Sequence, residues 1–171
     1  LNLMIYVCGC TDPSYSNYNP AATFDDGTCG LTYVPDDNFE NYLETHDENG
    51  MGVPLGNPNS MGDGIALNDY VTTANINTVT SLDVSDSGAG LNIADLTGIE
   101  DFIALTYLYC GYNSLTSLDL SNNINLASLS CQFNQLTNLD ISNSTSLTNL
   151  YCIVNQLTSL DVSTNTTLSQ L

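Results

Sequence analysis

Oxygen-bearing side chains gather near the start of the chain. The segment 9–29 reads GCTDPSYSNYNPAATFDDGTC and contains Asp12, Asn17, Asp25 and Asp26. Carboxylate and amide oxygens are the ligands that calcium prefers, so these four residues form a candidate calcium site. Turn chemistry is the alternative, because Asp-Pro, Asn-Pro and Asp-Gly pairs form turns without any metal.

Side chains that catalyse hydrolysis or hold zinc are sparse. His46 is the only histidine, so a zinc site or a catalytic triad would lack its partners. Carboxylates recur every 21 residues, at Asp119, Asp140 and Asp161. That recurrence favours a structural role, in which each bonds nearby hydroxyl or backbone groups, over a pair of catalytic acids. The chain is therefore predicted not to be an enzyme.

Five of the six cysteines fall into two sets, and Cys8 is left over. Cys10 and Cys29 bracket the acidic loop, and we expect a disulfide between them. Cys8 has three open fates: a free thiol, a bridge to another chain, or competition with Cys10 for Cys29. The remaining cysteines recur once per 21 residues and are expected to be free, buried thiols that pack as small apolar groups. They are Cys110, Cys131 and Cys152.

A strict repeat organises the second half of the chain. From residue 105 to 171 the period is 21 residues without slippage. The main apolar columns are Leu105/Leu126/Leu147/Leu168, Leu108/Leu129/Leu150/Leu171 and Leu115/Leu136/Leu157. A fixed period of this size predicts stacked coils, each of which buries its apolar edge only against its neighbours.

The repeat pattern L-x-x-L-x-C-x-x-N-x-L-T-x-L-D-(L/I/V)-S resembles the leucine-rich repeat family. It is most similar to the 21-residue form in secreted and surface proteins of Bacteroidetes. The segment 9–29 is likewise similar to a Cys-bounded motif in surface proteins of marine Bacteroidetes. The resemblance implies a mainly β solenoid of short parallel strands with little helix, and a role in adhesion or recognition.

Alternation along one coil predicts which side chains face inward. In the segment 107–111, Leu108 and Cys110 point inward while Tyr107, Tyr109 and Gly111 point outward. An asparagine follows in each coil, and its amide is expected to bond the unpaired backbone groups of the turn. Stacking makes these residues a ladder: Asn113, Asn134 and Asn155.

Three parts are expected along the chain. Residues 1–30 hold an apolar N-terminal strand and the Cys-bounded loop, residues 31–77 a cap with one short helix, and residues 78–171 the solenoid. Asp36 is the expected N-cap of the cap helix, whose apolar face would cover the first coil. By its sequence, segment 79–85 matches the return half of a regular coil, residues 115–121.

The charge balance narrows the possible partners. The chain has 19 acidic residues, no Lys and no Arg, which gives a formal charge of −19. Nothing can neutralise phosphates, so nucleic acid is disfavoured, as are anionic membranes. No membrane insertion is expected, since the apolar residues 1–7 are too short to span a bilayer. An acidic secretome, or selection against trypsin sites, explains the same composition without any ligand.

Outward aromatic and apolar side chains form the candidate binding face. These residues are Tyr107, Tyr109, Tyr112, Phe133, Tyr151, Ile153 and Val154. A repeated row of this kind suits contact with a protein or a glycan at the cell surface, although Tyr, Ile and Val also simply suit strands. The sequence thus predicts an extracellular interaction or adhesion solenoid. The alternative is a subunit of an extracellular filament, a homopolymer assembled head-to-tail through the open solenoid end and the apolar N-terminus.

Overall fold

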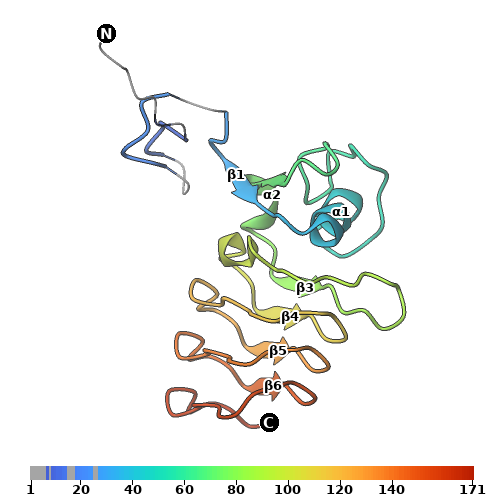
Figure 1. Ribbon diagram of the computed structural model, residues 1–171, viewed down its shortest axis with the longest axis vertical. Helices are drawn as coiled ribbons and strands as arrows, with labels where there is room; N and C mark the ends of the chain where they lie inside the picture. The colour runs from blue at the N-terminus through green and yellow to red at the C-terminus, as the bar shows by residue number, and fades with distance from the viewer. Residues whose placement is uncertain (1–6, 8, 15–17, 25–26) are drawn as a thin grey trace.

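Four short parallel strands stack in chain order along the solenoid (Figure 1). The computed structural model describes residues 7, 9–14, 18–24 and 27–171. The strands are β3 (Ser81–Asp83), β4 (Tyr107–Tyr109), β5 (Ser128–Ser130) and β6 (Asn149–Tyr151). Each connection runs through one full coil, which brings equivalent residues of successive coils into register.

The 21-residue period becomes a stack of buried leucines. Leu82 pairs with Leu108, Leu108 with Leu129, and Leu129 with Leu150. All four side chains are buried, and Leu105, Leu126 and Leu147 form a parallel buried column. The result is a mainly β solenoid with few helices, as the sequence predicts.

Two ladders of polar side chains close the turns between the walls. In the first, the Asn134 side chain accepts from the Leu115 N–H and donates to the carbonyls of Cys110 and Cys131. The second lies at the opposite turn, where Asn123 donates to the carbonyls of Ile99 and Phe102. The second ladder was not expected from the sequence, because Ser144 interrupts its asparagine column.

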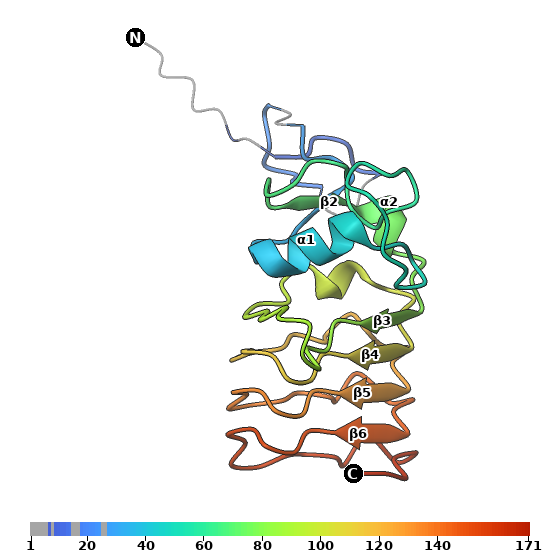
Figure 2. The ribbon, with the colours of Figure 1, turned by 90° about the vertical axis from the view of Figure 1, so that its right-hand side faces the viewer.

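A small cap covers the first coil (Figure 2). In the cap, strand β1 (Leu31–Tyr33) pairs antiparallel with β2 (Tyr70–Thr72), and the helices are α1 (Asp37–Thr45) and α2 (Thr73–Ile76). The 3₁₀ turn η1 (Ile99–Asp101) belongs to the first coil, between β3 and β4. Asp36 caps α1 by accepting from two N–H groups, as expected. Phe39 of α1 stacks on Phe102 with 6.4 Å between ring centroids, which fixes the helix on the solenoid. The antiparallel pair and α2 were not foreseen.

Two glutamates of α1 are buried in a chain without Lys or Arg. Glu40 accepts from the backbone N–H groups of Asn68 and Asp69, at 2.9 and 3.1 Å. Glu44 accepts from those of Asp63 and Gly64, at 2.6 and 2.9 Å. Each carboxylate therefore fastens one part of the cap loop by backbone amides instead of by an ion pair.

Strand β3 lies in a different half of its coil from the one predicted. The segment 79–85 resembles the return segment 115–121, yet Leu82 pairs with Leu108 on the strand wall. Both halves alternate apolar and polar residues, so the local pattern cannot separate them. The turn that follows decides the register, because Asp86 accepts from the N–H groups of Gly90 and Asn92 and so turns the chain there.

The last coil is less covered than the coils before it. Leu157, Leu160, Val162 and Leu168 are only partly buried, and Asn149 of β6 forms a parallel bridge with Gln170. A further coil or a second copy would cover this edge equally well. The filament assembly therefore stays a prediction, as does the three-part division of the chain.

The N-terminal loop is closed by a disulfide between Cys10 and Cys29, as expected. Residues 1–6, where the apolar strand was expected, lie outside the described residues, and so does Cys8. Within the part of the chain that the structure describes, no helix has the length and apolar character needed to cross a bilayer.

Candidate interaction surface

Two columns of outward side chains cover the strand wall, and we call them the strand face. Register places Tyr107 beside Ser128 and Asn149 in the first column, and Tyr109 beside Ser130 and Tyr151 in the second. Strand β3 opens the columns with Ser81 and Asp83. Successive positions in a column are about 4.8 Å apart, the usual spacing between strands.

The strand face has an uneven relief. Tyr107 is 45% exposed and Tyr151 43%, whereas Ser128 and Ser130 are only 8% and 7% exposed. The serines point outward but are small, so the larger side chains of the neighbouring strands shield them. This shielding was missed at the sequence level, because alternation predicts direction and not depth.

A ridge of apolar side chains follows the strands at the turn, and we call it the turn ridge. It consists of Tyr112, Phe133 and Val154, whose φ angles are 60°, 54° and 54°. Tyr112 and Phe133 stack with ring centroids 4.5 Å apart and an interplanar angle of 12°. All three side chains are exposed, as is the neighbouring Ile153.

The turn ridge is unfavourable for an isolated protein in two ways. A left-handed backbone costs about 1–2 kcal/mol for residues other than Gly, Asn or Asp, and β-branched Val154 suits it least. The part of their aromatic and aliphatic surface that stays exposed also contributes no stabilisation through burial. The left-handed backbone and the exposure recur in three successive coils.

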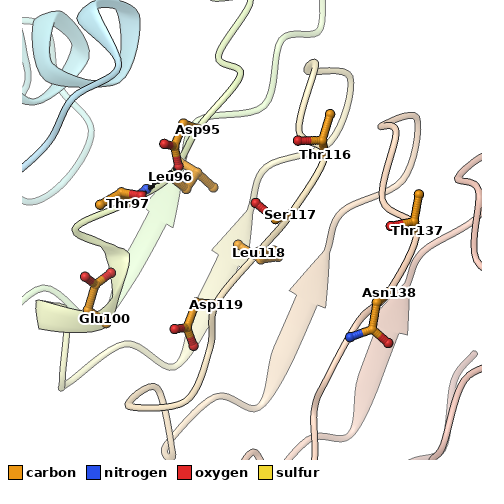
Figure 3. A pocket seen from close by; sticks show the side chains of 10 residues that line it. All are labelled: Asp95, Leu96, Thr97, Glu100, Thr116, Ser117, Leu118, Asp119, Thr137 and Asn138. Atoms are coloured by element: carbon orange, nitrogen blue, oxygen red, sulfur yellow. Dashed lines mark hydrogen bonds between the residues drawn. The ribbon is translucent and has the colours of Figure 1, made fainter.

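The opposite wall carries the repeated carboxylates, and Figure 3 shows the part of it around the first of them, Asp119. A cavity of about 340 Å³ there is lined by Asp95, Glu100 and Asp119 together with Thr, Ser, Asn and two Leu side chains. Asp119, Asp140 and Asp161 each accept from the N–H two residues on, at 2.8–2.9 Å. These hydrogen bonds make each carboxylate part of a turn.

Hydrogen bonds from Ser142 and Ser163 hold the pKa of Asp140 and of Asp161, respectively, below its usual value. A catalytic acid needs the opposite shift, since it must keep its proton near the working pH. The only histidine also has a local role. The His46 ring stacks on Tyr42 at 3.9 Å, and its Nδ1 lies 2.9 Å from the Tyr42 carbonyl oxygen.

The candidate calcium ligands are only partly described. Asp12 accepts from the N–H and the hydroxyl of Ser14, which is turn chemistry. Asn17, Asp25 and Asp26 lie outside the described residues, so calcium binding stays a prediction.

A second acidic group, not predicted as a set, joins Asp37, Glu40 and Asp69 within 4.8 Å. Glu40 already uses both oxygens to anchor the loop, and this anchoring accounts for the arrangement.

The repeated cysteines form one inward column with one thiol per coil. Cys110 and Cys131 are buried and Cys152 is partly buried, and all three are free. Burial raises the pKa of Cys131 to about 12 and raises the pKa of Cys110 and Cys152. They fill the solenoid core as neutral thiols.

The stacked coils, the leucine columns and the asparagine ladder define a class, and comparison with known proteins supports the same one: a leucine-rich repeat protein. No protein-family model matches the chain. Internalin J of Listeria monocytogenes serotype 4b (strain F2365) is 47% identical over 55 residues, which are 32% of this chain and 6% of that protein.

Solved structures extend the similarity over most of the chain. The functional domain of InlJ from Listeria monocytogenes, which includes a cysteine ladder, matches with a TM-score of 0.64 and 38% identity over 82% of this chain. The internalin InlF of the same species matches with a TM-score of 0.57 and 22% identity over 81%, which shows the fold alone. The chain spans 28% of the InlJ structure and 43% of the InlF structure. A source in Bacteroidetes stays a prediction.

Proposed function

We propose that this chain is a non-enzymatic interaction module of the cell surface, which binds a protein partner through the strand face and the turn ridge. The similarity to internalins supports an adhesive role at the surface of a cell. The observation that carries the proposal is the recurrence of exposed aromatic and apolar side chains from coil to coil: Tyr107 and Tyr151 on the strand face, and Tyr112, Phe133 and Val154 on the turn ridge. Aromatic side chains of this kind are enriched at the energetic centre of protein interfaces.

An array of purified extracellular proteins and glycans would test the proposal. The wild-type chain is expected to bind at least one protein, and the double variant Tyr109→Ala/Tyr151→Ala should bind it at least tenfold more weakly. The matched control is Thr116→Ala/Thr137→Ala, which changes two exposed residues of the opposite wall. Urea titrations show whether each variant stays folded.

Several outcomes would overturn the proposal. Equal binding by the tyrosine variant and the control would remove the strand face from the interaction. Hits confined to glycans would replace the protein partner with a carbohydrate. The filament alternative rests on the partly covered last coil, which a further coil would also cover, and electron microscopy of the purified chain distinguishes dispersed particles from polymers.

A further inference from the structure

One carboxylate of the strand face stands beside an aromatic ring. Asp83 of β3 is the register partner of Tyr109 of β4, so the two side chains leave the same face about one strand spacing apart. Asp83 is exposed, and its Oδ1 accepts from both the N–H and the hydroxyl of Ser85. The carboxylate is therefore held in place, and no described residue donates to its Oδ2.

The sequence contains neither Lys nor Arg, so no such side chain of this chain pairs with the Asp83 carboxylate. Tyr112 lies in the same coil as Tyr109 and stacks on Phe133 of the next coil. The chain after Asp83 stays close to this pair, because the Asp86 N–H donates to the carbonyl of Gly111, the residue before Tyr112. A fixed negative charge thus borders a surface of aromatic rings.

A guanidinium group fits both halves of this corner. Its plane stacks on aromatic rings, and its fork of N–H donors pairs with a carboxylate. A lysine ammonium can also approach a ring, but it is a compact and strongly hydrated point charge that has neither the stacking plane nor the fork of donors. We infer that the partner presents an arginine to the corner formed by Asp83 and Tyr109, an assignment that rests on the proposed function and names the chemistry of its partner.

The repeated carboxylates of the opposite wall lack this setting. Asp161 also accepts from a serine N–H two residues on, as Asp83 does. The residue equivalent to Asp161 in the preceding coil is Asp140, another carboxylate. The register partner of Asp83, in the following coil, is the aromatic Tyr109. The two aspartates therefore form a matched pair with the same charge and the same turn, and they differ in the neighbouring side chain.

Amide NMR of the whole chain tests the inference with two small probes, Nα-acetyl-arginine amide and Nα-acetyl-lysine amide, at equal concentration and salt. Arginine amide should shift the signals around Asp83 and Tyr109 most strongly and bind there about three- to fivefold more tightly than lysine amide, because only the guanidinium both stacks on the ring and donates in a fork to the carboxylate. Asp83→Asn, which can keep the turn to Ser85, should weaken binding by a similar factor. Asp161→Asn should leave binding at the corner unchanged.

The inference is overturned if both probes bind equally, if shifts spread evenly over the carboxylates, or if the two asparagine variants behave alike. These failures are distinct from failure of the proposed function. A partner that needs Tyr109 and Tyr151 but binds Asp83→Asn as tightly as the wild type would keep the function and reject the arginine. Arginine binding at the corner without any protein on the array would support the site and reject the function.

Discussion

Replacing Val154 by asparagine should stabilise the protein and weaken its binding at the same time. Val154 has a φ angle of 54° and is 59% exposed. A β-branched residue in this conformation costs about 1–2 kcal/mol, whereas asparagine adopts it readily. Less than half of the valine is covered, so the substitution removes less than about 1 kcal/mol of stabilisation by apolar burial. From the middle of each range, the net gain in the free energy of unfolding is about 1 kcal/mol.

Urea denaturation followed by circular dichroism measures this gain, and a melting curve should move upward by about 1–4 °C for a chain of this size. The matched control is Ile153→Asn. Ile153 is 64% exposed and has no positive φ, so asparagine relieves no strain there and should give no gain.

Two results would refute the reasoning. If Val154→Asn is no more stable than Ile153→Asn, the left-handed backbone is not strained in solution. If Val154→Asn is more stable and binds the partner as well as the wild type, the strain is real but the turn ridge does not serve binding.

Three further predictions concern the interior. Asn134→Ala should lower the free energy of unfolding by about 2–4 kcal/mol, because it leaves buried backbone groups without a hydrogen-bond partner. Asn155→Ala should lower it less, because its coil is less covered, and urea titration compares the two variants. Burial raises the pKa of Glu44, so the folded state holds this proton more tightly than the unfolded chain does. Its contribution to stability is full below the ordinary glutamate pKa and is lost as pH rises through the raised value; Glu44→Gln should make the melting temperature less dependent on pH in that window. Iodoacetamide at a pH of about 8 should alkylate Cys152 well before Cys131, whose pKa of about 12 leaves almost no thiolate; mass spectrometry of the native protein shows the order.

Periodicity is informative where one residue type does one job in every coil. The leucine columns and the Asn113, Asn134 and Asn155 ladder follow directly from 21-residue spacing, since stacking repeats the same contact. The Asp36 cap was also predictable, because capping depends on residues adjacent in sequence.

Features that depend on distant segments were not predictable in this way. Glu40 and Glu44 look like surface residues of a helix, and only the fold of the loop 63–69 buries them. The register of β3 was not predictable for the same reason. Both walls share one apolar–polar alternation, and only the turn after β3 determines that it lies on the strand wall. The corner of Asp83 and Tyr109 depends on that register and was missed with it.

The asparagine ladder determines how easily the solenoid can gain or lose a coil, because each asparagine bonds only to its own coil and its neighbour. Asn134 contacts its own coil and the preceding one, and Asn155 repeats the arrangement one step further. An in-frame duplication of one repeat in the gene would therefore insert a complete layer whose asparagine finds its partners at once. Recombination between repeats can lengthen or shorten the recognition surface one strand at a time, with no compensating mutation in the interior.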